Sequence, residues 1–546
     1  MTINRKAAYK CARCEIVFEY EGPGEPLECS KDFGGCGSPK NRTRFEAREL
    51  SRITIRGVNW TQVLRSDGYL GFAALIDDKV QFAHNLKDEN GIPINPVLDD
   101  TLLEEGVILP PMPEPYVNDK DLLEEIRVFI HEYLDVPSDI EKILSLYVPM
   151  TWLADKLTTV CYLRFIGDLG TGKSRGMTVI GSLCFNAIKT SGASSGAPVF
   201  RLLKRWGTST MLIDEADWSA SGEKADLTKI LNTGIEAGTP VLKCDPNNPN
   251  NVQTFPTFGP KIIGSRQSFA DTALESRCIS VVLLPTIRSD IIRTLDTSFR
   301  ERAKALRAKL LTFRLKSLSQ VNPDLIARTD LGPIEPRLAQ VMSCFVPILG
   351  TEGVALEEFK AFLLDYNRKL VLERGSSTDG LIVRTLHDLK AWLMAPTVKE
   401  IHANLEEEMS KKDAPTPQTI SRRLRPLGLT TRLERDGPLV RRNIKVTLED
   451  MVRLARRYIP FDDWDEDLKA KVCNACIACN DTVGGPPNQH LSLCNIRETP
   501  ETGGGPSPLL QSLQPLQGPE DLTKEDLEAR ILHDRAQNDP DDREGA

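Results

Sequence analysis

The sequence contains no apolar run of the roughly 18–20 residues that a helix needs to cross a bilayer, and no internal repeat is recognisable in its 546 residues. Its first residues, MTINRKAAYKCARC, are too polar for a secretory signal. We therefore expect a cytoplasmic protein without a membrane partner. At about 100–200 residues per domain, the length predicts three or four domains.

The sequence also lacks an excess of positive charge. Its formal net charge is −8, which by itself does not indicate a nucleic-acid binder. The charge is uneven, however: residues 421–457 carry eleven basic and four acidic side chains, whereas residues 519–546 carry four basic and ten acidic ones. The total therefore hides a basic patch and an acidic tail.

Pattern and composition divide the chain into eight segments. They are a cysteine-bearing module at 1–50, a small β-rich region with a Pro-rich linker at 51–118, a helical lead-in at 119–157, alternating strand-like and helix-like segments at 158–285, a mostly helical region at 286–393, a small basic unit of helices and strand-like arms at 394–459, a second cysteine-bearing segment at 460–500, and a disordered tail at 501–546. We therefore expect a multidomain α/β protein.

The most specific motif is GDLGTGKS, which follows the apolar run 160–166 and precedes a helical pattern. This is the spacing of a phosphate-binding loop in the strand–loop–helix setting that it requires. The glycines let backbone N–H groups close around phosphate oxygens, Lys173 would reach the β- and γ-phosphates, and Ser174 would bind Mg²⁺. The predicted nucleotide site consists of Gly167, Gly170, Thr171, Gly172, Lys173 and Ser174.

Polar residues follow or precede three further strand-like runs. Asp214 ends the run STMLID and would hold Mg²⁺, while Glu215 would act as general base on the attacking water. Ser265 ends the run KIIGS and could touch the γ-phosphate or orient the water. Arg277 precedes a fourth run and can act in trans as an arginine finger; an ordinary surface salt bridge is the alternative for this residue.

In this order, GDLGTGKS, MLIDEAD, KIIGSR and ALESRCI make residues 158–285 resemble the AAA+ ATPase core, particularly the compact helicases of viral, plasmid and other mobile-element replication systems. The resemblance covers about a quarter of the chain. It implies ATP and Mg²⁺ as cofactors and a ring, usually a homohexamer, whose active sites are shared between subunits. It also implies that Ser265 is a sensor, that Arg277 is the finger, and that Arg337 is a second sensor.

A hairpin is predicted between Glu215 and Ser265, where two strand-like runs flank the turn in PVLKCDPNNPNNVQTF. It resembles the hairpin that projects into the channel of replicative helicases of this type. That resemblance implies that Lys243 contacts single-stranded DNA. A plain surface hairpin is an equal alternative, because one lysine is weak evidence for phosphate binding.

Residues 397–459 predict a helix, a Pro-bounded turn, a second helix and two strand-like arms around Asp436-Gly437, an order that resembles a winged-helix domain. Clustered arginines suit the phosphates of duplex DNA. The alternatives are a domain that packs against protein or a solvated surface. The proposed DNA contacts are Arg422, Arg423, Arg425, Arg441 and Arg442.

Most of the thirteen cysteines lie in two clusters. Cys11, Cys14, Cys29 and Cys36 resemble a zinc ribbon, in which four thiolates bind a structural Zn²⁺. Their second pair is spaced more widely than usual, and four free cysteines are the alternative. The later cluster leaves zinc, an iron–sulfur cluster and free thiols open. It consists of Cys473, Cys476, Cys479, His490 and Cys494.

The expected fold is an AAA+ P-loop core with a small N-terminal β/zinc module and C-terminal helical and winged-helix regions. The expected function is an ATP-dependent DNA motor, a replicative helicase of a mobile genetic element. The alternative is an ATP-switched DNA-binding initiator or transcriptional regulator that does not unwind DNA. A remodelling ATPase that acts on protein would leave the arginine patch unexplained.

Overall fold

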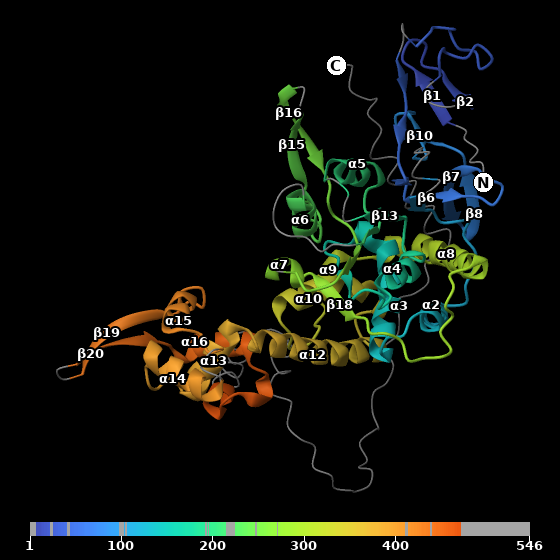
Figure 1. Cartoon of the computed structure of the whole chain (residues 1–546). Helices are drawn as coiled ribbons and strands as arrows, with labels where there is room; N and C mark the ends of the chain where they lie inside the picture. Colours follow the sequence, from blue (N-terminus) through green and yellow to red (C-terminus); the bar gives the residue numbers. More distant parts are fainter. Residues whose placement is uncertain are drawn as a thin grey trace, which may run out of the picture. The chain divides into compact units, whose positions relative to one another are not determined.

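The structure is a computed structural model (Figure 1). It describes residues 7–21, 26–40, 44–97, 103, 106–191, 194, 196–214, 224–245, 248–269, 271–409, 413–436 and 439–470. These residues form a mixed α/β protein with several sheets, and they all lie in the first of two units into which the chain divides, Met1–Cys494. Within these ranges, no helix is both long enough and apolar enough to span a bilayer.

Three small sheets form the N-terminal part. Their strands are β1 (Ala7–Cys11), β2 (Val17–Tyr20) and β3 (Phe45–Glu46); β4 (Arg48–Glu49), β9 (Leu86–Lys87) and β10 (Pro93–Asn95); and the antiparallel meander β5 (Arg52–Ile55), β6 (Val58–Leu64), β7 (Leu70–Ile76) and β8 (Lys79–Ala83). The buried Asn95 side chain accepts from Ala8 N at 2.8 Å and donates to Ala8 O at 3.0 Å. This amide therefore joins β1 to β10.

The central sheet has the strand order β11-β13-β14-β17-β12-β18. Its strands are β11 (Val107–Ile108), β12 (Tyr162–Ile166), β13 (Ala187–Ser191), β14 (Met211–Asp214), β17 (Lys261–Ser265) and β18 (Cys278–Val282). β11 pairs antiparallel with β13, and the other strand pairs are parallel. Because β17 lies between β12 and β14, the carboxyl ends of these three strands meet at one edge of the sheet.

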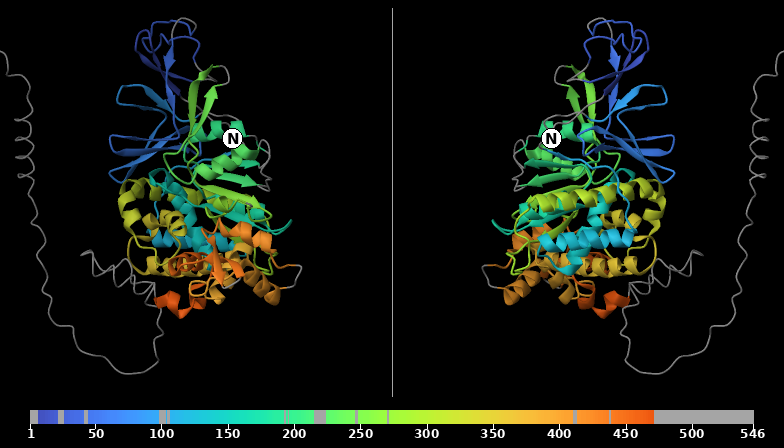
Figure 2. Two further views of the ribbon diagram at one scale, coloured as in Figure 1. Left: turned by 90° about the vertical axis from the view of Figure 1, so that its left-hand side faces the viewer. Right: turned by 90° about the vertical axis from the view of Figure 1, so that its right-hand side faces the viewer.

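Helices surround and follow this sheet. They are α2 (Asp119–Tyr133), α3 (Ser138–Leu153), α4 (Lys173–Gly181), α5 (Gly196–Trp206), α6 (Lys224–Thr233), α7 (Thr272–Glu275), α8 (Thr297–Ser317), α9 (Pro323–Arg328), α10 (Pro336–Met342), α11 (Val346–Leu349) and α12 (Val354–Gly375), with short 3-10 turns η1 (Ala154–Lys156), η2 (Leu318–Gln320) and η3 (Ser343–Phe345). Asn118 and Asp296 cap α2 and α8 through their side chains. α2, α3 and α8 pack against one another (Figures 1 and 2).

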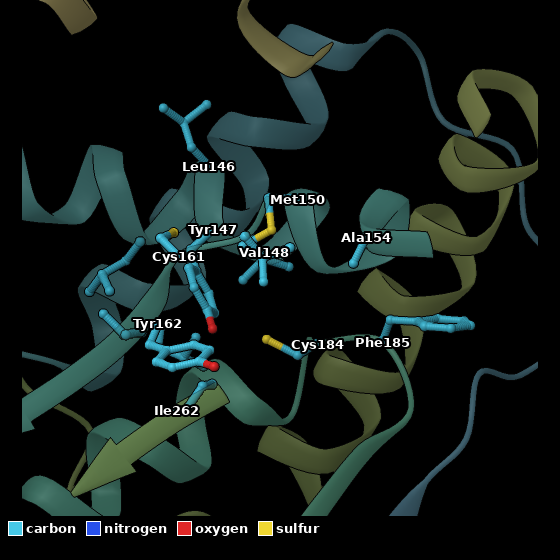
Figure 3. Close-up of a cluster of buried hydrophobic side chains, with 14 of the residues drawn as sticks. Leu146, Tyr147, Val148, Met150, Ala154, Cys161, Tyr162, Cys184, Phe185 and Ile262 are labelled. Carbon is cyan, nitrogen blue, oxygen red and sulfur yellow. The ribbon is translucent and has the colours of Figure 1, made fainter. Parts of the chain in front are cut away.

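The main core lies between α3 and the central sheet. α3 is apolar on nearly every side, which is typical of a buried helix. Figure 3 shows its Tyr147 near Tyr162 of β12, with Cys184 and Ile262 in the same cluster. The buried hydroxyls are satisfied, because Tyr147 donates to Lys261 O at 3.0 Å and Tyr162 donates to Leu231 O at 2.9 Å.

Lys261, at the start of β17, is a buried cation that makes folding pH-dependent. Its Nζ donates to Thr257 O and Gly259 O, each at 2.9 Å, and burial lowers its pKa to about 7. The unfolded chain keeps this proton up to a pKa of about 10.4, so stability rises with pH between these values by up to about 1.4 kcal/mol per pH unit. The destabilisation by the buried charge is fully present below pH 7.

Lys261→Met removes this ionisation. We expect the free energy of unfolding of the wild type, minus that of the variant, to increase from pH 7 to pH 9 in urea titrations. A difference that stays constant across this range would show that Lys261 is not deprotonated in the fold.

A second core belongs to the C-terminal part of the described chain. Its elements are α13 (Thr378–Asp388), α14 (Val398–Glu408), α15 (Pro417–Leu424), β19 (Thr430–Asp436), β20 (Leu439–Lys445), α16 (Leu448–Tyr458) and η4 (Phe461–Asp463). Ile382, Ile401, Ile420 and Ile444 are buried together in it. The helices and the strand pair expected for residues 397–459 are therefore present as α14, α15, β19 and β20.

Candidate functional site

The glycine-rich loop connects β12 to α4 as the motif predicts. Gly170 and Gly172 have φ values of 82° and 98°, a region that favours glycine. A Cβ at Gly167 would lie 2.4 Å from Thr171 Oγ1 and 2.8 Å from Leu283 O, so the loop has no room for a side chain there. Lys173 begins α4, and its Nζ donates to the loop carbonyls Gly167 O (2.5 Å) and Asp168 O (2.8 Å).

Ser174 and Asp214 meet at this edge of the sheet. Ser174 Oγ donates to Asp214 Oδ2 at 2.7 Å. A hydroxyl beside a carboxylate is the pair of oxygen ligands that holds Mg²⁺ in phosphate-binding-loop proteins. A Cβ at Gly264 of β17 would lie 2.7 Å from Asp214 Oδ1, so glycine at this position leaves room for the carboxylate.

A pocket of about 310 Å³ opens between the loop and the ends of β14 and β17. It is lined by Leu169, Gly170, Gly172, Lys173, Ser174, Arg175, Asp214, Gly264, Ser265 and Arg266. The Ser265 Oγ is buried and has no hydrogen-bond partner among the described residues, although Ser265 lines the pocket. A buried hydroxyl without a partner is costly, so this atom fits a ligand or water held in the pocket. The glycine cradle, the cation and the oxygen pair fit ATP and Mg²⁺.

Arg277 lies at the amino ends of the strands, whereas this pocket lies at their carboxyl ends. It directly precedes β18, and its backbone carbonyl accepts from Tyr162 N, at the amino end of β12. A strand of five residues is about 16 Å long, so the Arg277 side chain is far from the phosphate-binding loop of its own chain. Burial, and then the nearby Arg337, lowers the pKa of Arg277.

Arg337 lies near Arg277, at the amino ends of the strands. It lies in the first turn of α10, and its Nη1 donates to Glu236 Oε1 at 3.1 Å and to Gln340 Oε1 at 2.6 Å. The structure therefore brings Arg337 to Arg277 rather than to Lys173. Glu215, the predicted general base, lies outside the described residues.

The predicted hairpin is present as β15 (Val241–Asp245) and β16 (Asn248–Phe255). Lys243 does not extend freely from it: its Nζ donates to Asp226 Oδ2 at 2.7 Å and lies 4.0 Å from the centroid of the Phe200 ring. The exposed residues of the hairpin include Leu242 and Val252. A DNA contact by Lys243 would therefore have to replace its pairing with α6.

The predicted DNA-contacting arginines are all exposed but do not share one surface. Arg422, Arg423 and Arg425 lie at the end of α15, where Arg423 pairs with Asp379 at 3.6 Å. On the β19–β20 ladder, Arg442 is opposite Leu433 and two residues before the buried Ile444, so it shares the face of Ile444, whereas Arg441 takes the other face.

The four N-terminal cysteines converge. Their sulfur atoms all lie within 4.8 Å of one another, and Sγ–Sγ distances include 3.9 Å (Cys11–Cys36) and 3.7 Å (Cys14–Cys29). Zn–S bonds of about 2.3 Å in a tetrahedron place sulfurs about 3.8 Å apart, so the cluster fits a structural zinc ion. Burial raises the pKa of Cys29 to about 12, and a cation is what would favour its thiolate. The cluster at 473–494 lies outside the described residues.

Cys29→Ser is expected to remove one equivalent of zinc per chain, because it deletes a buried ligand of this cluster. Elemental analysis of the purified full chain measures the change. Cys244→Ser is the control, since Cys244 is an exposed cysteine on β15. Equal zinc contents in the two variants would contradict the site.

Arg266, which follows Ser265 at the end of β17, also lines the pocket. Two other arginines, Arg175 and Arg164, were not predicted as functional. Arg175 follows Ser174 and donates to Tyr133 O (2.8 Å) and Arg293 O (2.7 Å), which ties α4 to α2 and to the segment before α8. Arg164 is buried inside β12. For Arg175 and Arg164 the sequence carries no signal, because their partners lie far away in the chain.

No protein-family model matches this sequence, and no curated protein is significantly similar to it. Among solved structures, the chain is similar to the A form apo structure of the NrS-1 C-terminal region. The identity is 12%, the TM-score is 0.35, and the match covers 69% of this chain and 94% of that one. For a second structure of that region, residues 305–718, the identity is 12% and the TM-score is 0.33, and the match covers 71% of this chain and 96% of that one. At this level of similarity, the function has to be inferred from the site.

Proposed function

We propose that this chain is an ATP-hydrolysing motor that acts on DNA, with an AAA+-type core. The observation that carries the proposal is the meeting of Lys173, Ser174, Asp214 and the unpartnered Ser265 in one pocket at the carboxyl edge of a parallel sheet. Ligands of open α/β sheets bind at this edge. The position of β17 between β12 and β14 also supports the resemblance to the AAA+ core.

Each side chain then has a role in phosphoryl transfer. Mg²⁺ would neutralise charge on the β- and γ-phosphate oxygens. Ser174 and Asp214 would hold the ion, and Lys173, which donates to the loop carbonyls here, would bind phosphate oxygens instead. Ser265 orients the attacking water from its buried position, and Glu215 accepts the proton from that water.

The placement of Arg277 supports a shared active site. Since this side chain is about a strand length from its own loop, it serves a neighbouring nucleotide only in an assembly with head-to-tail contacts. Such contacts form a ring when the rotation between subunits closes. A homohexamer is the ring size that the resemblance implies. Arg337 lies beside Arg277, so we assign it to the same neighbouring nucleotide rather than to the pocket of its own chain.

The alternative function is an ATP-switched DNA-binding initiator. The exposed arginines of α15 and β20 favour it, because they suit duplex phosphates whether or not the ATPase moves along DNA. Both functions need the same pocket, and they differ in how DNA affects turnover.

The test is ATP hydrolysis by the full chain with and without single-stranded DNA, beside Lys173→Ala. For a motor, single strands stimulate hydrolysis strongly and Lys173→Ala abolishes it. Slow ATP hydrolysis that single-stranded DNA does not stimulate, together with tight binding of duplex DNA, favours the initiator. A wild-type chain that does not hydrolyse ATP would rule out both.

Replacing Arg422 and Arg425 by alanine is expected to weaken duplex binding to a similar extent for all sequences. Each lost phosphate contact should also reduce the slope of log K against log salt by about one. Fluorescence anisotropy from 50 to 200 mM salt measures both. Arg300→Ala, an exposed arginine on α8, serves as the control. An unchanged salt slope in the double variant would exclude α15 from the DNA contact.

A further inference from the structure

Arg164 is an unusual residue for its position. It lies in the middle of β12, the strand that leads into the phosphate-binding loop, and its side chain is fully buried. Strands of parallel sheets with both faces covered are normally apolar throughout. A guanidinium in such a place is costly unless it is paired and hydrogen-bonded. Arg164 does not line the nucleotide pocket, so its pairing calls for another explanation.

The partner of Arg164 is Glu275, the last residue of α7. Arg164 Nη1 donates to Glu275 Oε2 at 2.6 Å, and Nη2 donates to Oε1, which makes a bidentate ion pair. Nη2 also donates to Ser280 Oγ at 2.7 Å. The guanidinium lies 4.7 Å from the centroid of the Phe269 ring, and Phe269 N donates to Glu275 Oε2 at 2.9 Å.

Glu275 thus joins three segments that matter for the proposed reaction. One is β12 with its loop. The second is the chain that follows the pocket residues Ser265 and Arg266 and reaches Phe269 four residues after Ser265. The third is α7 itself, on which Arg277 depends: its backbone N donates to Leu274 O at 3.1 Å, and its Nη1 donates to Ala273 O.

We propose that the Arg164–Glu275 ion pair positions Arg277 for the nucleotide of the neighbouring subunit and couples that position to the pocket of its own subunit. This inference rests on the proposed function. A change at Ser265 when nucleotide binds reaches Glu275 through Phe269, while Arg164 keeps α7 in register with β12. Arg164 and Glu275 are positioning residues, and the finger that they place acts at the next site of the ring.

The test uses complementation between subunits. Glu275→Gln keeps the shape of the side chain and removes its charge. Alone, this variant should lower kcat as Arg277→Ala does, with nucleotide affinity retained. Mixed with Lys173→Ala, it should regain hydrolysis at up to about a quarter of the sites in a random one-to-one ring, since the Lys173→Ala neighbour supplies an intact finger. Mixed with Arg277→Ala it should regain nothing, because both subunits lack a working finger.

The reverse pattern would overturn the proposal. If Glu275→Gln is rescued by Arg277→Ala and not by Lys173→Ala, the ion pair supports its own pocket and not the finger. Unchanged kcat in Glu275→Gln would also overturn it. If Lys173→Ala and Arg277→Ala do not complement each other, the active site is not shared between subunits and the proposed function fails. That outcome can be distinguished from failure of the ion-pair proposal, in which these two variants do complement each other.

Two further variants keep the test decisive. Glu132→Gln removes a carboxylate of α2 that is 32% exposed, close to the 31% of Glu275, and that pairs with Arg302. We expect it to leave kcat unchanged. Arg164→Lys keeps the charge but loses the bidentate fork, so it should give a milder kcat defect with the same complementation pattern. Binding of a fluorescent ATP analogue confirms that each variant is folded.

Discussion

Arg277→Ala is expected to lower kcat for ATP hydrolysis by about 10³-fold or more, the range found for arginine fingers. Affinity for nucleotide should change little, because Arg277 lies at the edge of the sheet opposite its own loop. The variant therefore separates binding from turnover. Steady-state hydrolysis and titration with a fluorescent ATP analogue measure the two quantities.

Arg205→Ala is the matched control for this effect. Arg205 is a surface arginine that pairs with Glu49 at 2.7 Å, and its loss should leave kcat unchanged. If Arg277→Ala hydrolyses ATP as fast as the control does, the active site is not shared between subunits. If both binding and turnover fall, Arg277 supports its own fold rather than a neighbour's nucleotide.

Asp155→Asn is expected to cost about 3–5 kcal/mol of unfolding free energy, because it leaves buried guanidinium groups without a counter-charge. Asp155 accepts from Arg314 Nη1 at 2.7 Å and Nη2 at 2.8 Å, and Arg52 Nε lies 3.3 Å from its Oδ2. Arg314 is 1% exposed, and its guanidinium lies 4.4 Å from the centroid of the Phe185 ring. This cluster links β5, which carries Arg52, to η1, which carries Asp155, and to α8, which carries Arg314.

The same carboxylate predicts an acid effect. The two arginines hold the pKa of Asp155 well below its usual range, although burial alone would raise it. The stabilisation that the charged Asp155 provides is fully present above about pH 3.9, the pKa of Asp in the unfolded chain. This stabilisation is lost as the pH falls further. The wild type should therefore lose more stability than Asp155→Asn on acidification. Asp67→Asn, which breaks an exposed pair with Arg65, should lower the free energy of unfolding far less than Asp155→Asn does in the same urea titrations.

The local parts of the proposed nucleotide site could be predicted from the sequence. The spacing of the loop predicts its left-handed glycines and the position of Lys173, since both depend on neighbouring residues. The apolar runs before Asp214 and Ser265 predict strand ends, and parallel strands bring such ends to one edge. In the structure, β17 lies between β12 and β14. In this arrangement, Ser174 Oγ lies 2.7 Å from Asp214 Oδ2.

Long-range pairs could not be predicted. Lys243 pairs with Asp226 of α6, and nothing in either segment indicates the other. Arg164 lies in an apolar run that predicts an ordinary buried strand, and its partner Glu275 is 111 residues away in the sequence. The N-terminal module and β10 are likewise joined by Asn95, whose amide is unremarkable in the sequence. Such contacts depend on topology, which periodicity does not encode.

The two-residue strand β11 has a practical consequence for making shorter versions of this protein. Val107 and Ile108 close the β13 edge of the central sheet, although they belong to the stretch that precedes the helical lead-in. A fragment that begins at residue 119 would leave the backbone groups of β13 open to strand addition by another molecule, which is a route to aggregation. An expression fragment of the core should therefore begin before Val107, where the chain still supplies its own edge.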